Sequence, residues 1–302
     1  MRITEVCTEE NFIWKNDYSS SYLYRRDASS IHMVMKYQIP FSPDDEKIFM
    51  ERFDIPVSER KEFYQNLLKC IQQQIKASAI LAQQNVPSCI KFYGAEQERD
   101  ENGITSIYLE TDYLRPLCQT TLSELTDELE AANIASRLAI ILRDLQKEPH
   151  KVTLRALDPN EIFINDENKL VLGGLFYAAS PFLPEPPKFL PTVTPNIHKD
   201  VLTGGTGHAG TDMYSLACMI WNLYAGIPLD AKLPEHIDVF PQYASEDLAM
   251  TLLLGRHGRE EDVAAFRRQL GKCRACYSKK DTAPVKIPIR RQRRKEYIIS
   301  IV

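Results

Sequence analysis

The sequence predicts an α+β protein with two lobes, in which short strands and one long helix come first and helices dominate afterwards. Most β-prone runs fall before residue 115, and beyond it apolar residues recur mainly at helical spacing. The chain has 302 residues, of which 44% are hydrophobic and 26% are charged, as in ordinary globular proteins. At ~150 residues per domain, this length fits two domains or one bilobal unit.

Five strands are predicted in the first lobe, because β-branched and aromatic residues gather there between turn-forming residues. They span 12–14, 22–25, 32–38 and, around a polar hairpin at 97–103, 89–93 and 106–111. Residues 41–57 are polar and contain prolines, which predicts a loop. A long helix is predicted over 59–84, with Ser58 as its N-cap and with Phe63 and Leu67 on its apolar face.

The second lobe is predicted to be mostly helical. Ile134 and Leu138 belong to the apolar face of a first helix, and an apolar helix is predicted over 212–224. Between them, two small strands over 162–164 and 170–172 enclose a turn. Further helices are expected up to about residue 277.

We expect three regions along the chain: a first lobe over 1–112, a second lobe over 113–277 and a basic tail over 278–302. The net charge of −4 gives no overall attraction to nucleic acid or to an anionic membrane. Seven cysteines at scattered spacing indicate a reducing compartment. The first residues lack the apolar run of a secretory signal, and no apolar run is long enough to cross a bilayer. We therefore expect a cytoplasmic protein without membrane or nucleic-acid partners, although the basic run 290–295 leaves a nuclear location open.

Three segments resemble the signature motifs of the protein kinase superfamily, serine/threonine type, in the family's order and spacing. Residues 211–228, T-D-M-Y-S-L-A…Y-A-G-I-P, are similar to S-D-x-[WY]-S-[LF]-G…L-x-G-x-P. Residues 154–164, L-R-A-L-D-P-N-E-I-F-I, resemble the catalytic loop H-R-D-L-K-P-E-N-I-F-L, and their spacing to 169–176 matches the run into D-F-G. Val34-Met35-Lys36 is similar to V-A-I-K. The resemblance implies a bilobal protein-kinase-like fold, with a small β-rich N-lobe that carries one long helix and a larger helical C-lobe.

The resemblance also places four catalytic groups of a kinase, and none of these positions carries the required residue. Ala156 stands where an Asp would accept the substrate proton, and Asp158 stands where a Lys would steady the transferred phosphate. Glu161 stands at the Asn position that holds a second Mg²⁺, and Gly174 stands at the D-F-G Asp position. We therefore expect no catalytic residue and no metal site, and the chain is predicted not to be an enzyme.

Nucleotide binding lacks its usual groups as well. The first glycine of the chain is Gly94, so the turn over 15–21 has no glycine with which to cradle phosphate. Lys36 is the one candidate cofactor-binding residue, but no Asp or Glu occurs between Glu62 and Glu96 to pair with it from the long helix. We expect neither ATP binding nor any other cofactor.

Four positions are assigned structural roles by the resemblance. Asp212 is expected to accept hydrogen bonds from the backbone of the catalytic loop. Leu154 and Leu175 replace the His and Phe of the internal spine of a kinase, and both remain apolar. Asp200 takes the Glu place of the A-P-E motif, where it would pair with an arginine such as Arg256 or Arg259.

The resulting prediction is a catalytically inactive pseudokinase that acts as a protein-binding scaffold or as a structural or allosteric subunit. Its partner would be one or more proteins, such as an active kinase or a cytoskeletal assembly. Three contact surfaces are proposed from the sequence: the Pro-rich segment 181–195, the long helix 59–84 and the basic tail. The Pro-rich segment has polyproline II character, which suits either docking on an aromatic groove or packing on the protein itself.

Two alternative functions stay open at this stage. In the first, a divergent kinase uses relocated acids, Asp158, Glu161 or Asp166, for metal or base chemistry. In the second, a regulatory module grips the adenine of a nucleotide through Lys36 and a hinge at 111–114, without phosphate transfer.

Overall fold

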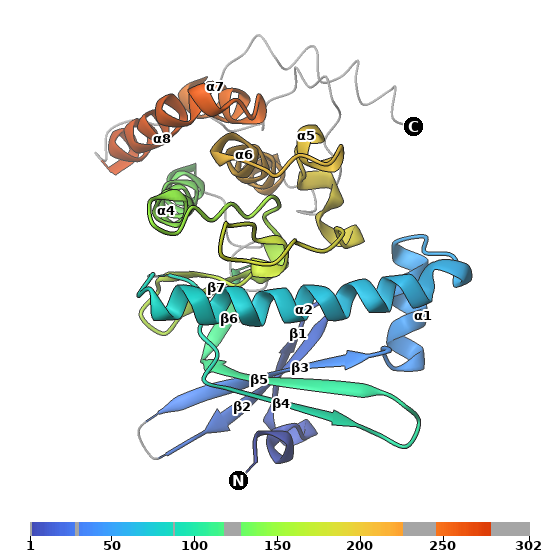
Figure 1. Ribbon diagram of the computed structural model, residues 1–302. Coiled ribbons are helices and arrows are strands. Elements are labelled where there is room, and N and C mark those ends of the chain that lie inside the picture. The colour runs from blue at the N-terminus through green and yellow to red at the C-terminus, as the bar shows by residue number, and fades with distance from the viewer. Residues whose placement is uncertain (1, 28–29, 87, 118–127, 226–245, 279–302) are drawn as a thin grey trace. The chain divides into compact units, whose positions relative to one another are not determined.

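Figure 1 shows the computed structural model of the chain, which describes residues 2–27, 30–86, 88–117, 128–225 and 246–278. Contacts divide the chain into two units: unit 1 comprises Met1–Gln119 and Asn160–Thr192, and unit 2 comprises Thr120–Pro159 and Val193–Val302. Within the described ranges, helices and antiparallel sheets occur together, so the predicted α+β class is confirmed. The lobe limits at residues 112 and 277 stay predictions.

The main sheet of unit 1 has five antiparallel strands in the order β1-β2-β3-β5-β4 (Figure 1). The strands are β1 (Phe12–Lys15), β2 (Ser19–Arg25), β3 (Ile31–Ile39), β4 (Gly94–Arg99) and β5 (Thr105–Asp112). The central strand β3 is covered on both faces. Tyr37 contacts a helix on one face, and Val34 packs with Ile3 and Tyr108 on the other. This double coverage explains why both Val34 and Tyr37 are fully buried.

The fourth strand lies later in the chain than the sequence indicates. The predicted strand over 89–93 is wrong: Cys89 forms only an isolated bridge with Leu172, and β4 begins at Gly94. β4 therefore takes up part of the predicted hairpin, and the chain turns at Asp100–Gly103, where Gly103 has φ +81°. β4 is an edge strand in which every residue after Ala95 is charged or polar, a composition that protects an edge but does not signal a strand.

The segment between β3 and the long helix contains a second helix, α1 (Pro43–Arg52), so the prediction of a loop over 41–57 is wrong. Ser42 caps α1, since its Oγ accepts a hydrogen bond from the backbone N–H of Asp45 at 3.3 Å. Pro43 is the first helical residue, a position where the missing N–H of proline costs nothing. The proline that argued for a loop therefore marks the start of a helix.

The long helix α2 (Arg60–Gln83) agrees with the prediction to within a residue at each end. A short 3₁₀ turn, Val57–Glu59, precedes it, so Glu59 and not Ser58 occupies the N-cap. Phe63 and Leu67 are buried on its apolar face, as their spacing predicts. In Figure 1, α2 runs along the whole of one face of the main sheet.

A second sheet in unit 1 has three antiparallel strands, β6 (Leu114–Pro116), β7 (Ile162–Asn165) and β8 (Leu170–Leu172), in the order β6-β7-β8. The two small strands predicted over 162–164 and 170–172 are confirmed as β7 and β8. The turn between them is closed by Asn165, whose Oδ1 accepts the backbone N–H of Glu167 and of Lys169.

Short 3₁₀ helices occur in both units. They lie at Ile3–Val6, Glu9–Asn11, Pro159–Glu161, Leu175–Tyr177, Pro191–Asn196 and Glu260–Asp262.

Unit 2 is helical in the ranges that the structure describes. It contains α4 (Glu128–Gln146), α5 (Lys199–Leu202), α6 (Ala209–Ala225), α7 (Glu246–Arg256) and α8 (Val263–Ser278). The helix predicted over 212–224 is confirmed as α6. α4 packs on α6 and α8, and α7 packs on the same two helices, around buried side chains such as Leu138, Leu216 and Phe266.

Several sequence features lie outside the described residues. These are the Gly226-Ile227-Pro228 end of one kinase-like motif, the basic run 290–295 and nearly all of the tail. None of the helices in the described ranges combines the length and the apolar character that a membrane crossing requires.

Candidate functional site

The turn between β1 and β2 is held by its own side chains. Asn16 Oδ1 accepts hydrogen bonds from the backbone N–H of Tyr18 at 3.0 Å and of Ser19 at 2.7 Å. Asn16 Nδ2 donates to Oε1 of Glu161 at 3.0 Å, and Glu161 is fully buried. A side-chain amide thus takes the place at which a glycine-rich turn would expose its backbone to a ligand.

The next two residues of this turn, Asp17 and Tyr18, also contact the later segment of unit 1, Asn160–Thr192. Asp17 accepts hydrogen bonds from Arg52 at 3.0 Å and from Asn160 at 3.2 Å. Tyr18 is 3% exposed, its ring lies 6.1 Å from that of Phe176, and its hydroxyl group is hydrogen-bonded to Thr192. The turn is therefore anchored to the segment Asn160–Thr192 at three consecutive residues.

Trp14, at the end of β1, lies against the predicted hinge. Its indole N–H donates to the backbone carbonyl group of Leu114 at 3.0 Å. Its ring centroid is 5.7 Å from that of Phe163, at an interplanar angle of 35°, within the range of favourable aromatic pairs. Trp14 is only 5% exposed, so a large aromatic ring with a hydrogen-bond donor occupies the space beside the hinge.

A neutral pair connects β3 to α2. Gln74 of α2 donates through Nε2 to the hydroxyl group of Tyr37 at 3.3 Å, and both side chains are fully buried. Successive side chains of a strand point to opposite faces, so Lys36 lies on the face that is turned away from α2. The resemblance placed Lys36 toward the long helix, whereas Tyr37 is hydrogen-bonded to it.

The Lys36 side chain instead lies on the face of the sheet that is turned away from α2. Its Nζ lies 5.7 Å from the centroid of the Tyr108 ring, on the neighbouring strand β5. No acidic side chain of the described chain lies within ion-pair distance of Lys36. A half-buried cation without an acidic partner thus faces away from the site that the resemblance assigns to it.

The four positions that the resemblance aligns with the catalytic groups of a kinase lie in both units and are all buried. Ala156 and Asp158, in unit 2, are each 1% exposed. In unit 1, the backbone carbonyl group of Glu161 accepts the N–H of Gly173 at 2.7 Å and of Gly174 at 3.3 Å. Gly173 is required sterically, because a Cβ there would lie 2.4 Å from the Phe163 ring.

Asp212 is the best-defined polar group of unit 2. Its carboxylate accepts the backbone N–H of Arg155 at 2.9 Å and of Leu154 at 3.1 Å, and it accepts the amide of Gln146 at 2.8 Å. These are the backbone contacts that the resemblance leads one to expect of Asp212. Arg155 has φ +64°, a left-handed conformation that is unfavourable for a long side chain. Burial raises the pKa of Asp212 to about 6, and the hydrogen bonds from Gln146, Leu154 and Arg155 oppose that shift.

The other assigned positions are simpler. Leu154, in unit 2, and Leu175, in unit 1, are fully buried. The side chain of Asp200 is 61% exposed, and its nearest basic group is Nδ1 of His198, at 3.5 Å. The arginine pairing predicted for Asp200 is therefore wrong within the described residues, and the guanidinium group of Arg256 lies over the Trp221 ring instead.

The part of the Pro-rich segment that belongs to unit 1, residues 181–192, is hydrogen-bonded to α2. Asn66 donates to the carbonyl group of Lys188 at 2.7 Å, and Gln73 donates to those of Ala178 at 2.8 Å and Pro184 at 3.2 Å. This geometry matches the second alternative raised by the sequence, in which the segment packs on the protein itself.

Two of these contacts were missed by sequence reasoning. Trp14 reads as an ordinary strand residue, and its partner Leu114 is 100 residues away. The pair Tyr37–Gln74 could have been found only by counting strand parity from the buried helix, because a shift of one residue exchanges the two faces.

Neither a protein-family model nor a curated protein matches this chain. Among the residues that the structure describes, no three His, Cys, Asp or Glu side chains are grouped closely enough to hold a metal ion.

Proposed function

We propose that the chain is a catalytically inactive protein-kinase-like protein, a pseudokinase, that works as a protein-binding scaffold or as a structural subunit of an assembly. The observation that carries this proposal is the contact of the Trp14 indole with Leu114. In a kinase-like fold, the hinge at 111–114 is where adenine would bind, and here a side chain of the chain itself occupies its carbonyl group.

The architecture of each unit supports a bilobal kinase-like fold. Unit 1 combines a five-stranded antiparallel sheet with one long helix between its third and fourth strands, as the resemblance requires of the smaller lobe. Unit 2 is helical in its described ranges, as the larger lobe would be. Since fold alone does not define activity, we infer the function from the residues of the site.

The adenine position is the first step. An adenine ring bound at a hinge needs an open slot between apolar walls and a free backbone acceptor. Trp14 packs against Phe163 in a tilted arrangement and donates to Leu114, so its indole supplies both contacts from within the chain. At 5% exposure it leaves little room for a second aromatic ring.

The phosphate position is the second step. Kinases cover the phosphates with a glycine-rich turn, because only glycine lets the backbone approach them closely. Here the turn carries Asn16, Asp17 and Tyr18, each in contact with the segment Asn160–Thr192. Asp17 would in addition repel phosphate.

The third step concerns the charged pair that orients phosphates in an active kinase, a lysine on the third strand and an acid on the long helix. Tyr37 and Gln74 occupy these elements as a neutral hydrogen-bonded pair. A neutral pair supports packing of α2 on the sheet, but it supplies no positive charge to a nucleotide.

The alternative of a divergent kinase with relocated acids is less well supported. A general base must reach the proton that it removes. Asp158 is 1% exposed and Glu161 is fully buried, with one carboxylate oxygen held by Asn16. Asp166 is exposed, but it lies in the turn between β7 and β8. Gly174 still offers no metal ligand.

The proposed contact surface for a protein partner is the groove between the first half of α2 and the Pro-rich segment. It is lined by Ser58, Lys61, Glu62, Gln65, Asn66, Lys69, Glu185, Pro186, Pro187 and Lys188. Its rim is polar and carries both signs of charge, as in the rims of transient interfaces. The basic tail remains a second candidate surface.

The first test is a thermal-shift titration of the full chain with ATP, with and without Mg²⁺ or Mn²⁺. We expect no shift, whereas a ligand at about a hundredfold excess over its Kd would stabilise the fold by ~2.7 kcal/mol. A metal-dependent shift of several degrees would overturn the proposal and favour the divergent kinase.

A second test addresses the scaffold role directly. Proteins recovered with the native chain are compared with those recovered with the double variant Lys61→Glu, Lys69→Glu. We expect the loss of a specific partner, while Lys47→Glu on the exposed side of α1 leaves its recovery unchanged. Equal recovery by all three chains would remove the α2 groove as the contact surface.

A further inference from the structure

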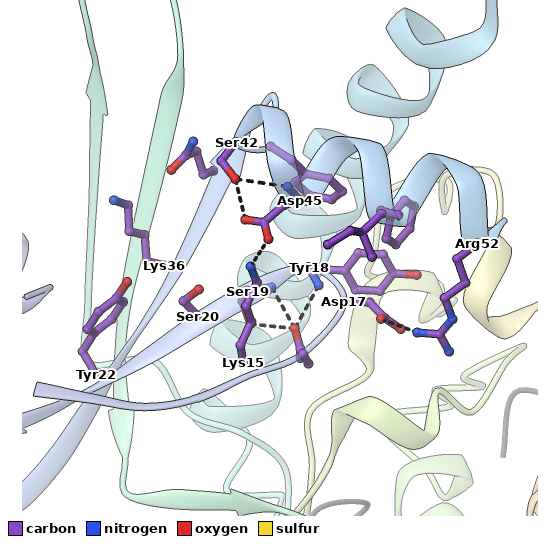
Figure 2. Close-up of a pocket in the computed structure, with 15 residues that line it drawn as sticks. Lys15, Asp17, Tyr18, Ser19, Ser20, Tyr22, Lys36, Ser42, Asp45 and Arg52 are labelled. Atoms are coloured by element: carbon purple, nitrogen blue, oxygen red, sulfur yellow. Dashed lines mark hydrogen bonds and ion pairs between the residues drawn. The ribbon is translucent and has the colours of Figure 1, made fainter. Parts of the chain in front are cut away.

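A cavity of about 170 Å³ opens in unit 1 between the main sheet and α1 (Figure 2). Its walls come from the β1–β2 turn, from β2 and β3, and from the segment Phe41–Arg52. Lys36 and Gln38 of β3 face it, on the side of the sheet that is turned away from α2. We call it the Lys36 cavity; it does not include Trp14 or the hinge. It shares the β1–β2 turn discussed above, but it lies on the face of the sheet that is turned away from α2, and Asp17 in this turn is paired with Arg52.

Three strands place two lysines on either side of a serine. In register, Lys15 of β1 lies opposite Ser20 of β2, and Ser20 lies opposite Lys36 of β3. Directly opposite residues share a face, and neighbouring strands lie ~4.8 Å apart, which separates the two lysine backbones by about 10 Å. Figure 2 shows Ser20 between Lys36 and Tyr22 on one side and Lys15 and Asp45 on the other.

The charges around the cavity are unequal. Lys15 is paired with Asp45, and Arg52 is paired with Asp17 at 3.0 Å. Lys36 has no acidic partner among the described residues, so three cations face two acids and the uncompensated charge is that of Lys36. A half-buried ammonium group of this kind is stabilised by an anion that enters the cavity.

The remaining polar groups are donors suited to an anion. The hydroxyl groups of Ser20 and Tyr22 and the amide of Gln38 line the cavity beside Lys36. Within the described chain, no hydrogen bond engages the Gln38 side chain. Burial raises the pKa of Tyr22, and a hydrogen bond with Ser20 opposes that shift, so the Tyr22 hydroxyl group stays protonated and able to donate.

From this arrangement we infer that the Lys36 cavity binds a phosphate group, free or as part of a small phosphomonoester, over Ser20 and against the ammonium group of Lys36. Lysine binds phosphate as a point charge with three rotatable donors. At ~30 Å³ per water molecule, the cavity volume corresponds to about six water molecules, which exceeds one phosphate and leaves space for a small organic part. Ile48 and Phe49 of α1 supply an apolar wall for that part.

Asp45 limits the affinity of this site. Burial alone would raise the pKa of Asp45, but hydrogen bonds from Lys15 and Ser42 and the charge of Lys15 lower it, so it is ionised and opposes an anion. Asp45→Asn removes this charge and releases the ammonium group of Lys15 toward the cavity. The variant is therefore expected to bind phosphate several-fold more tightly than the native chain does.

The experiment is isothermal titration calorimetry of the full chain with inorganic phosphate, with glycerol 3-phosphate and, as the neutral control, with glycerol. We expect both phosphates to bind and glycerol not to bind. Lys36→Met, which keeps the length of the side chain, should weaken the binding at least tenfold. Lys47→Met removes a lysine from the exposed side of α1, outside the cavity, and should leave the affinity unchanged.

The free and esterified sources of phosphate are separated by the two probes. Tighter binding of glycerol 3-phosphate assigns the apolar wall to an organic part, and equal binding assigns the site to phosphate alone. Lys36→Arg keeps the charge and should retain binding even if Lys36→Met folds poorly. Failure of both phosphates to bind at about 10 mM, or equal affinity of native and Lys36→Met chains, would overturn the inference.

Discussion

Asp212 in unit 2 and Gln74 in unit 1 are both buried polar side chains on long helices, and they contact different kinds of groups. Asp212 accepts hydrogen bonds from the backbone N–H groups of Leu154 and Arg155. Gln74 donates to the side chain of Tyr37. If the chain is a pseudokinase as proposed, Asp212, which holds loop backbone, keeps the residue type of a kinase. The pair Tyr37–Gln74, which stands where charged side chains would orient a nucleotide, is neutral.

This difference has a physical reason. Backbone N–H groups cannot be substituted, so a buried loop that depends on them needs a strong acceptor whatever the loop does. A pair of side chains can change together, provided that the new pair satisfies its own hydrogen bonds. Selection for a stable fold alone would therefore preserve Asp212 and release the pair between β3 and α2.

The largest effect is expected at Asp212. Asp212→Ala leaves the N–H groups of Leu154 and Arg155 without their acceptor and should lower the free energy of unfolding by about 3–5 kcal/mol. Denaturant unfolding followed by circular dichroism measures it. Asp166→Ala, at an exposed turn, is the matched control and should change stability by no more than about 0.5 kcal/mol. A loss below about 1 kcal/mol in Asp212→Ala would show that the loop backbone does not depend on this carboxylate.

The second prediction concerns the neutral pair. Tyr37→Phe removes the acceptor of the Gln74 amide and should cost about 1–3 kcal/mol, because a buried donor is left unsatisfied. Tyr37→Phe combined with Gln74→Leu removes both polar groups and should cost less than Tyr37→Phe alone. A double-mutant cycle of unfolding free energies measures the coupling. Additive losses would mean that the two side chains contribute separately and that the comparison with Asp212 fails.

The fold was predictable where local pattern and burial agree. α2 and α6 follow from apolar spacing that the packed core requires, and β7 and β8 follow from short apolar runs around an Asn-rich turn. β4 was misplaced because an exposed edge strand carries charges in place of apolar residues. α1 was missed because a proline after a serine was read as a break and not as a capped helix start.

The candidate site was predictable only where a motif fixes a residue's partner. The hydrogen bonds at Asp212 could be expected from its place in a motif, whereas the partner of Trp14 is set by tertiary packing that no local pattern encodes. Lys36 shows a third case. The lysine was noted from the sequence, but the face of the sheet on which it lies depends on strand parity. The next residue, Tyr37, faces the helix in place of Lys36.

A third prediction uses the pKa of Asp212, which is about 6 in the folded chain against an ordinary value of 3.8. Because the folded state binds the proton of Asp212 more tightly than the unfolded state does, protonation of Asp212 stabilises the fold. This contribution to the free energy of unfolding is complete at low pH and is lost as the pH rises through 6. Between about pH 5 and pH 7, the free energy of unfolding of the native chain should fall by roughly 1–1.5 kcal/mol relative to Asp212→Asn, which does not titrate. Unfolding curves of both chains at the two pH values test this. If the native chain instead became more stable relative to Asp212→Asn as the pH rises, the hydrogen bonds would outweigh burial and hold the pKa of Asp212 below its ordinary value.

The smallest effect on stability is expected from the loss of the Trp14–Leu114 hydrogen bond alone, and substitutions at Trp14 separate two roles of this residue. Trp14→Phe keeps an aromatic ring against Phe163 but removes the donor to Leu114, which should cost about 1 kcal/mol. Trp14→Ala removes the ring as well and leaves a cavity beside the hinge. If the ring itself excludes adenine, adenosine should raise the melting temperature of Trp14→Ala but not that of Trp14→Phe or of the native chain. Adenosine binding by Trp14→Phe would instead assign the exclusion to the occupied carbonyl group of Leu114. Stabilisation of the native chain would mean that the hinge is open in solution, and the pseudokinase proposal would then lose the observation on which it rests.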